Sequence, residues 1–257
     1  MVMKLKVLGC SGADLPGHHL SGFLLDQKIL FDAGSLTYVL GEKDQMKIES
    51  IFITHAHLDH IIGIPFLADN IIVGKHRSRV NIFAIPSVVR TIKRNLFNSA
   101  VWPDFTEIPN IEESILNLIE LKAGHSILID EFTIASYPVQ HTVPAVGYLV
   151  EDRREKRFFY TGDAGPTGET WRELKDKKID ALIIDVSFPN RMKELALRTG
   201  HLTPALLKEE LQKIDPKPKS IYATHIKPQY HMTIQTELGN LKVENLQVLK
   251  DGETIRV

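Results

Sequence analysis

The sequence predicts an α/β protein in which two mixed β-sheets pack face to face and helices cover their outer surfaces. Short apolar runs bounded by Gly, Asp or Pro occur along the whole chain, and such runs are typical of strands. Several of these runs follow one another directly, whereas helical patterns separate others. In one doubly wound parallel sheet a helix would follow nearly every strand, so consecutive strands favour two mixed sheets with helices outside.

The first half of the chain opens with strands and then alternates. Strands are predicted over residues 4–10, 22–26, 29–32, 48–54 and 80–84. Helical patterns cover 60–69 and 87–97. The second of these helices follows Pro86, and the first turn of a helix tolerates proline.

The second half of the chain repeats this mixture. Strands are predicted over residues 126–137, 145–150, 157–161, 181–184, 220–223 and 247–257. Helices are predicted over 168–175 and 203–214. Thr203 is a suitable N-cap for the second helix, and Pro204 suits its first helical position.

The composition is that of an ordinary globular protein. The 257 residues, of which 43% are hydrophobic and 25% charged, suit one domain spanning 1–257. With 31 basic and 32 acidic side chains the formal net charge is −1. No overall positive field therefore attracts a polyanion, and nucleic acid is not an expected partner.

The single cysteine and the hydropathy pattern favour a cytoplasmic protein. Cys10 alone cannot form an internal disulfide, and a lone cysteine after an opening strand is usually a small buried apolar residue. No stretch reaches the roughly 18 apolar residues of a membrane span. Residues 1–12 alternate as a strand does and lack the charged and apolar blocks of a signal peptide.

The densest group of chemically active residues lies at 54–60, with the sequence Thr-His-Ala-His-Leu-Asp-His. Alternate residues of an extended stretch point the same way, so His55 and His57 can bind one metal ion. Asp59 and His60 fall at the turn into a predicted helix and can face a second metal ion. Imidazole and carboxylate groups suit zinc and similar divalent metals, and such sites activate water. A single histidine is usually a satisfied core or surface side chain, but this density has no evident structural purpose.

Three further residues stand at the ends of predicted strands. They are His141, Asp163 and His225. Strand ends are where an α/β scaffold gathers its site residues. Asp163 is the natural bridging ligand, because a charged oxygen between two cations offsets their repulsion. Each residue alone could be a turn or capping residue, but with the first group they complete a site for two metal ions.

The order of these motifs resembles the metallo-β-lactamase superfamily. A His-x-His-x-Asp-His motif is followed by a His, a Gly-Asp and a Thr-His at strand ends. Segments 55–65, 186–190, 200–204 and 224–228 look like those of class II cyclic-nucleotide phosphodiesterases.

This resemblance implies a fold, a ligand set and an activity. The fold is a four-layer αβ/βα sandwich with two divalent metal ions, zinc being favoured over manganese or iron. The resemblance places His55, His57 and His141 on one metal and Asp59, His60 and His225 on the other, with Asp163 between them. The implied activity is hydrolysis of 3′,5′-cyclic AMP or cyclic GMP, with the choice of nucleotide and a homodimeric state left open.

Phosphodiester cleavage suggests roles for three residues. Asp59 would orient the attacking hydroxide as well as bind metal. The departing sugar oxygen needs a proton, and His201 is the candidate acid. Asp185 could hold the other ring nitrogen of His201 and raise its pKa. The phosphodiesterase pattern has Glu at this position, so the shorter Asp185 puts the pairing distance in question.

Other functions remain open at this level. A ribonuclease Z-like endonuclease shares the metal ligands and a similar pair of carboxylate and His, but its usual first motif has Gly where this chain has Leu58. Only 21 residues separate His141 from Asp163, which leaves no room for a long tRNA-binding arm. A hydrolase of lactones or thioesters and a non-catalytic metal-binding protein are further alternatives. Redox members of the superfamily carry Glu where this chain has His57, so hydrolysis is favoured.

Several polar groups have two interpretations each. His18 and His19 lie in the loop 14–21, where they could line the entrance to the site or be solvated. The basic run 75–79 could meet a phosphate or form an exposed turn; its basic residues are Lys75, His76, Arg77 and Arg79. Asp32 is expected to support the site or close a turn.

The remaining candidates are aromatic side chains and two isolated histidines. Phe97, Trp102 and Phe105 could form a stacking surface for a base, a subunit contact or plain core packing. His125 and His231 are expected on the surface or in loops.

Overall fold

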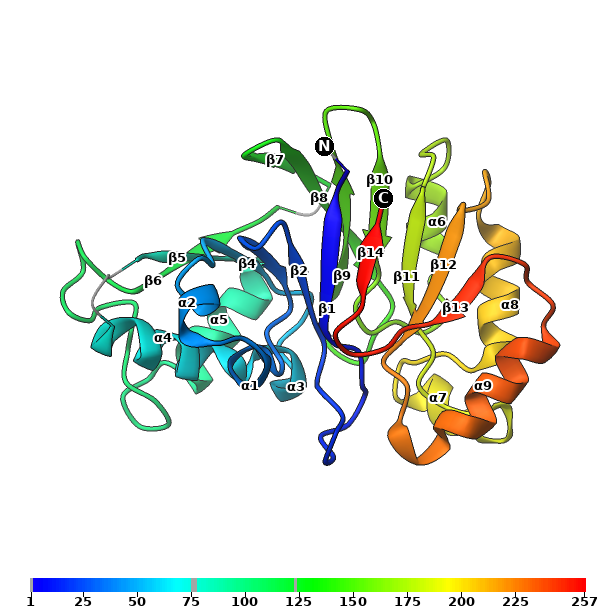
Figure 1. The fold of residues 1–257 in the computed structure, drawn as a ribbon, viewed down its shortest axis with the longest axis horizontal. Coiled ribbons are helices and arrows are strands. Elements are labelled where there is room, and N and C mark those ends of the chain that lie inside the picture. Colours follow the sequence, from blue (N-terminus) through cyan, green and yellow to red (C-terminus); the bar gives the residue numbers. More distant parts are fainter. Residues whose placement is uncertain (1, 75–77, 123) are drawn as a thin grey trace.

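The computed structural model describes residues 2–74, 78–122 and 124–257. Within these ranges the chain forms two seven-stranded sheets that face each other, with helices on both outer sides (Figure 1). The helices of the first half lie on one side and those of the second half on the other.

The first sheet has the strand order β14-β1-β2-β3-β4-β5-β6. Its strands are β1 (Lys4–Gly9), β2 (Gly22–Leu25), β3 (Ile29–Phe31), β4 (Ser50–Phe52), β5 (Val80–Ala84), β6 (Leu116–Glu120) and β14 (Thr254–Arg256). The pairs from β14 to β3 are antiparallel, and those from β3 to β6 are parallel. The sheet is therefore mixed, as the consecutive strands of the sequence predict.

The second sheet has the strand order β13-β12-β11-β10-β9-β8-β7. Its strands are β7 (Ser126–Ile129), β8 (Phe132–Val139), β9 (Ala145–Glu151), β10 (Arg157–Tyr160), β11 (Ala181–Asp185), β12 (Ser220–Thr224) and β13 (Leu246–Val248). The pairs from β7 to β10 are antiparallel and those from β10 to β13 are parallel.

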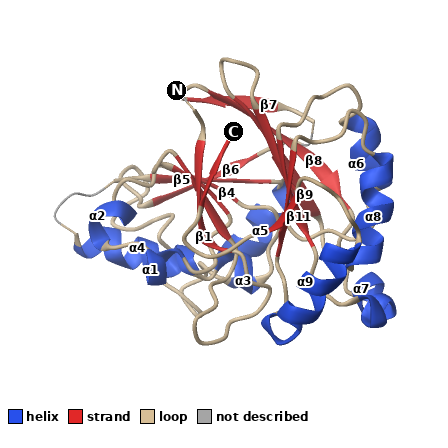
Figure 2. Ribbon diagram, turned by 45° about the vertical axis from the view of Figure 1, so that its right-hand side comes forward, coloured by secondary structure: helices blue, strands red, loops and turns tan. Residues whose placement is uncertain are grey.

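Helices form the two outer layers (Figure 2). The first sheet is covered by α1 (Leu36–Val39), α2 (Glu42–Gln45), α3 (Leu58–Ile61), α4 (Gly63–Val73) and α5 (Pro86–Asn95). The second sheet is accompanied by α6 (Gly168–Glu173), η1 (Asn190–Met192), α7 (Lys193–Arg198), α8 (Pro204–Lys213), η2 (Pro228–Tyr230) and α9 (His231–Asn240). The expected four-layer α/β architecture is confirmed.

The core between the two sheets is rich in aromatic rings. Phe31 of β3 packs against Tyr148 of β9 and Phe158 of β10, with ring centroids 5.8 and 5.5 Å apart. Phe52 of β4 meets the same Tyr148 ring at 5.4 Å. The Tyr148 hydroxyl donates to the Ile53 carbonyl oxygen at 2.8 Å, so this buried polar group is satisfied. These contacts hold the two sheets together next to the carboxyl end of β4.

Several predicted elements differ from the structure. The single strand expected over 126–137 is two strands, because Asp130 adopts the left-handed conformation (φ 52°) and closes a hairpin. Asp tolerates this conformation better than most residues, so no Gly or Pro marks the turn. The closing strand expected over 247–257 is also two strands, which belong to different sheets. The helix expected over 60–69 begins at Leu58, is interrupted at Ile62 and continues to Val73.

Some elements carry no clear signal in the sequence and are absent from the prediction. They are β6, α1, α2, α7 and α9. In the described part of the chain, no helix combines the length and the apolar character needed to cross a membrane.

Candidate metal centre

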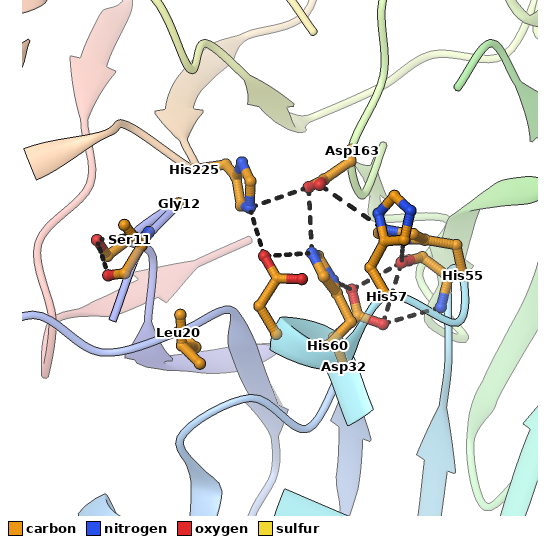
Figure 3. Close-up of polar contacts among 12 residues, drawn as sticks. Ser11, Gly12, Leu20, Asp32, His55, His57, His60, Asp163 and His225 are labelled. Carbon is orange, nitrogen blue, oxygen red and sulfur yellow. Dashed lines mark hydrogen bonds and ion pairs between the residues drawn. The ribbon is translucent and has the colours of Figure 1, made fainter. Parts of the chain in front are cut away.

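Seven side chains from four places in the sequence converge at one edge of the two sheets. Figure 3 labels His55, His57, His60, Asp163 and His225 of this set. They follow the carboxyl ends of β4, β8, β10 and β12, or lie on α3 directly after β4. The members are His55, His57, Asp59, His60, His141, Asp163 and His225. Their ligand atoms form two groups that share Asp163, and within each group these atoms lie within 4.8 Å of one another. The two groups coincide with the two ligand sets that the sequence suggests.

The first group has three imidazole nitrogens facing one point. Nδ1 of His57 lies 3.0 Å from Nε2 of His55 and 3.2 Å from Nε2 of His141. Burial lowers the pKa of all three rings, and repulsion between neighbouring rings lowers it further. These histidines are therefore neutral at pH 7, and neutral imidazole is the form that binds metal.

The second group gathers around the Asp163 carboxylate. Oδ1 of Asp163 lies 3.2 Å from Nε2 of His60 and 3.4 Å from Nε2 of His225. Asp59 completes the group, with Oδ2 at 3.4 Å from Nε2 of His225. Burial alone would raise the pKa of Asp163, but the charges of His225 and His60 hold it well below its usual range. A buried, ionised carboxylate thus stands between the two groups.

The His60 ring shows what this carboxylate requires. Burial alone would lower the pKa of His60, but the carboxylates of Asp163 and Asp32 raise it well above its usual value. The carboxylates of Asp163 and Asp32 are therefore stabilised by positive charge at this point of the pocket. Nε2 of His60 and Oδ1 of Asp163 are buried 3.2 Å apart, but among the residues described neither atom makes a hydrogen bond of good geometry. Buried polar atoms without a hydrogen bond cost about 1–3 kcal/mol each. A divalent cation would satisfy both atoms and supply the charge, so the residues present fit metal binding.

The donor set narrows the choice of metal. Nitrogen and carboxylate oxygen donors in groups of four suit zinc, and manganese or iron accept the same atoms. Asp59 has about 30% of its side chain exposed, so the second group opens toward solvent on this side. An open side is what separates a catalytic metal site from a closed structural one.

Asp32 supports His60 directly and His55 through Thr54. Its Oδ2 accepts from Nδ1 of His60 at 2.8 Å and from the Tyr160 hydroxyl at 2.8 Å. Its Oδ1 accepts from the backbone N–H of Thr54 at 2.8 Å. The Thr54 hydroxyl in turn lies 3.0 Å from Nδ1 of His55. The expected supporting role of Asp32 is consistent with these contacts, which leave Nε2 of His55 and His60 facing the centre.

Gly200 and Ser187 orient the other two histidines in the same way. The Gly200 carbonyl oxygen lies 2.9 Å from Nδ1 of His141, and the Ser187 hydroxyl lies 2.9 Å from Nδ1 of His225. Gly200 has a left-handed backbone (φ 69°), and a Cβ there would lie 2.8 Å from Nδ1 of His141. Only glycine lets the chain approach this ring so closely.

His201 and Asp185 form a buried pair beside the centre. Nδ1 of His201 lies 2.6 Å from Oδ2 of Asp185, so the shorter Asp does reach the ring. Burial lowers the pKa of His201, but the Asp185 carboxylate outweighs burial and raises it above its usual value. The ring stacks on His225 with centroids 5.3 Å apart. His201 can therefore carry a proton next to the metal centre.

Sequence reasoning missed the hydroxyl groups of this site. Thr54 and Ser187 stand within motifs quoted for other residues, and Tyr160 belongs to a strand of the core. A hydroxyl that supports a ligand has no pattern of its own in one sequence. The only available signal was adjacency to a motif residue.

The loop histidines lie outside the two ligand groups. His19 pairs through Nδ1 with Oδ2 of Asp251 at 3.0 Å. His18 lines a cavity of about 190 Å³ together with Cys10 and His231. Cys10 is only partly buried and its thiol donates to Asp251 at 3.2 Å, so describing it as a buried apolar residue was wrong. His231 is partly exposed and begins α9, so of the two expected positions, surface or loop, the loop is wrong.

The aromatic candidates belong to the core, and most of the basic candidates lie outside the described residues. Phe97 and Phe105 are buried in the core beneath the first sheet, and Trp102 packs against that core. The interpretation as core packing is confirmed. Lys75, His76 and Arg77 lie outside the described residues. Arg79 donates to the Ser114 hydroxyl at 3.1 Å.

Comparison with known proteins identifies the family. Residues 27–226 match the model of the β-lactamase superfamily domain. The chain belongs to this family. Membership confirms the resemblance that the motifs suggest and places the chain among the metallo-β-lactamase-fold hydrolases.

Relatives within the family carry two different names. A probable 3′,5′-cyclic-nucleotide phosphodiesterase of Yersinia pestis is 28% identical over 209 residues, which cover 72% of this chain and 59% of the relative. A ribonuclease Z of Archaeoglobus fulgidus is 24% identical over an alignment of 315 residues, covering 100% of this chain and 98% of the relative. The chain spans little more than half the length of the two curated phosphodiesterases it matches, at 59% and 54%.

Solved structures share the fold. The crystal structure of unliganded yeast PDE1 has a TM-score of 0.85 at 19% identity and covers 100% of this chain and 99% of that chain. At this level of identity the likeness concerns the architecture alone.

Proposed function

We propose that this protein is a two-metal phosphodiesterase that hydrolyses 3′,5′-cyclic nucleotides to nucleoside 5′-monophosphates. The observation that carries the proposal is the His201–Asp185 pair, with 2.6 Å between Nδ1 and Oδ2, beside two groups of metal-binding side chains. A carboxylate-held histidine next to a metal centre supplies a proton to a leaving oxygen, which a phosphodiester requires.

The seven side chains of the centre would hold two divalent ions, with zinc as the favoured metal. When bound, such ions polarise the phosphoryl group and lower the pKa of water. His55, His57 and His141 would hold one ion, and Asp163 would bridge to the other. Asp59 lies on the open side, where its carboxylate can orient the attacking water.

The reaction adds one water molecule across the bond between phosphorus and O3′. The water oxygen bonds to phosphorus, the P–O3′ bond breaks, and O3′ leaves as a hydroxyl with the proton of His201. Nδ1 of His201 faces Asp185, which leaves Nε2 to donate this proton. Asp185 holds the ring in one orientation and stabilises its protonated form. The proton released by water then restores His201.

The surface beside His141 offers room for a nucleoside. A hollow of about 820 Å³ is lined by His141, by the residues that follow it to Val146, and by the start of α5 with Arg90. Its walls are mostly apolar and include Ile85 and Leu121. An apolar hollow next to the reactive centre suits a base and a ribose.

A ribonuclease Z-like activity is the second candidate, and one observation favours it. The Archaeoglobus fulgidus ribonuclease Z aligns with 100% of this chain, whereas the phosphodiesterases align with less. Two observations weigh against it. Residues 142–162 are occupied by β9, β10 and their short connections, and the sequence pI of about 6.8 gives no excess positive charge for tRNA.

The test is a parallel turnover assay of the purified, zinc-loaded chain. The substrates are cyclic AMP, cyclic GMP, a precursor tRNA and a lactone. Turnover of a cyclic nucleotide to its 5′-monophosphate supports the proposal. Cleavage of tRNA or lactone without turnover of either cyclic nucleotide would replace it with the corresponding activity.

Three further proposals concern the domain organisation, the location and the oligomeric state. We propose that residues 1–257 act as one domain, that the protein works in the cytoplasm and that it can form a homodimer. Size-exclusion chromatography with light scattering tests the last of these. Limited proteolysis tests the first, since a single domain yields no stable fragment.

A further inference from the structure

Lys227 is a half-buried lysine two residues after His225. Its ammonium group donates a hydrogen bond to the Gly12 carbonyl oxygen. Gly12 itself packs on His225, since a Cβ at Gly12 would lie 2.4 Å from the His225 carbonyl oxygen. Figure 3 shows Gly12 beside the His225 ring. The charge of Lys227 is therefore anchored at the flank of the metal centre.

No described carboxylate forms an ion pair with this ammonium group. Lys156 and Lys219, by contrast, both pair with Asp180, at 3.3 and 2.5 Å. Within the described residues, the Gly12 carbonyl is the hydrogen-bond acceptor of Lys227. An ammonium group has three N–H donors, so two remain for another partner.

The ammonium group lies on the His201 side of the centre. It lies 5.9 Å from the centroid of the Phe188 ring, and that ring lies 5.7 Å from the His201 ring. The cation and the proposed proton donor are thus neighbours of the same aromatic ring.

We propose that Lys227 is a substrate-binding residue whose ammonium group contacts a non-bridging oxygen of the phosphoryl group. This inference rests on the proposed function of the same site. The bond to Gly12 holds the ammonium group in place before the ligand arrives, so little side-chain freedom is lost on binding. The two free N–H groups give charge-assisted hydrogen bonds to a phosphate oxygen. The ligand class is therefore a phosphodiester or its phosphomonoester product.

The test measures binding of inorganic phosphate to the full, zinc-loaded chain by calorimetry. The variants are Lys227→Met, which keeps a long side chain without charge, and Lys227→Arg, which keeps the charge. Lys28→Met is the matched control, because Lys28 is an exposed lysine in the turn between β2 and β3. We expect Lys227→Met to raise Kd about tenfold, the effect of one lost hydrogen bond between charged groups. Lys227→Arg and Lys28→Met should stay within about threefold of the native Kd.

Kinetics with bis(p-nitrophenyl) phosphate give a second measurement. A residue that binds ground state and transition state alike raises KM and leaves kcat nearly unchanged, and we expect this split for Lys227→Met. An unchanged Kd for Lys227→Met would overturn the inference. Loss of zinc from that variant would also overturn it, because Lys227 would then act by supporting Gly12 and His225. A native chain that binds phosphate through Lys227 but turns over no cyclic nucleotide would instead refute the proposed function.

Discussion

The imidazole of His201 and the carboxylate of Asp185 meet at 2.6 Å in a buried position beside His225. Neither residue is a member of the two groups of candidate ligands described above, to which Asp163 is common. Their side-chain donor atoms also lie within 4.8 Å of those of Asp163 and His225, so these four residues form a third group that could hold a metal ion. The proposed division between His201 as proton donor and the other residues as metal ligands leads to distinct expectations for each kind of variant.

Replacing His201 should separate turnover from metal binding. We expect His201→Ala to retain two metal ions per chain and to slow turnover by about 10²-fold or more, the scale of a lost general acid. Metal content is measured by plasma mass spectrometry and turnover with cyclic AMP. Loss of metal from this variant would show that His201 is a ligand.

Replacing Asp185 tests the positioning of His201. Asp185→Asn removes the charge that raises the pKa of His201 and leaves the shape nearly unchanged. We expect kcat to fall about tenfold or more with little change in KM, because the protonated ring loses its partner. The NMR signals of the His201 ring should shift while those of His55 stay in place. Unchanged kcat would contradict the role of this pair.

Replacing Asp163 tests the shared ligand. We expect Asp163→Asn to hold fewer than two metal ions per chain, because the carboxylate that both groups share is lost. The direction follows from charge, since a neutral amide cannot offset the repulsion between two cations. Full occupancy by two ions in this variant would show that the bridge is not required.

Gly200 should be required for its close approach to His141. Its φ of 69° and the 2.8 Å clash of a Cβ with Nδ1 predict that Gly200→Ala destabilises the fold by about 1–3 kcal/mol. Gly239→Ala is the matched control in helix α9, where nothing lies within 4 Å of an added Cβ. The control should be neutral or stabilise by up to about 1 kcal/mol. Urea denaturation of both variants provides the comparison.

Asp180 should contribute stability that depends on pH. Burial raises the pKa of Asp180, but Lys219, the Arg157 N–H and Lys156 outweigh it and lower the pKa. A lowered pKa in the folded state means stability that is present above the unfolded pKa of about 4 and is lost as pH falls through the folded value. We expect Asp180→Asn to lower the free energy of unfolding by about 1 kcal/mol at pH 7, and the difference should vanish near pH 2.

The matched control for this series is Asp176→Asn. Asp176 is exposed and forms no ion pair with the residues described. Its replacement should leave the unfolding free energy unchanged across the same pH range. A constant difference between Asp180→Asn and the native chain at every pH would show that the carboxylate charge is not the cause.

The sequence predicts the part of the candidate site whose residues are neighbours along the chain. Four potential metal donors lie within the six residues from His55 to His60. Their closeness in space can therefore be predicted from the sequence without knowing the fold. His141, Asp163 and His225 meet them only because the ends of β8, β10 and β12 reach the same edge. Strand ends and family resemblance together were enough to select those three.

What the sequence could not predict depends on contacts between distant backbone segments. The ring of His141 is held by the carbonyl oxygen of Gly200. Because every residue has a backbone carbonyl, such a contact leaves no signal in the sequence. The hairpin at Asp130 has no Gly or Pro to mark it, so the sequence pattern predicts one strand where the structure has two. The split of the last strand depends on which sheet each half joins, and no periodicity records that choice.

That split has a consequence for how the protein folds. β14 pairs with β1 in the first sheet, so Lys4 lies opposite Arg256. The preceding strand, β13, pairs with β12 in the second sheet. Asp251, between these two strands, accepts from the Cys10 N–H, and the Cys10 carbonyl oxygen accepts from the His225 N–H. Contacts so far apart in sequence form slowly. The pairing of β14 with β1 and the contact of Asp251 with Cys10 can therefore form only after residues 251–256 have been synthesised.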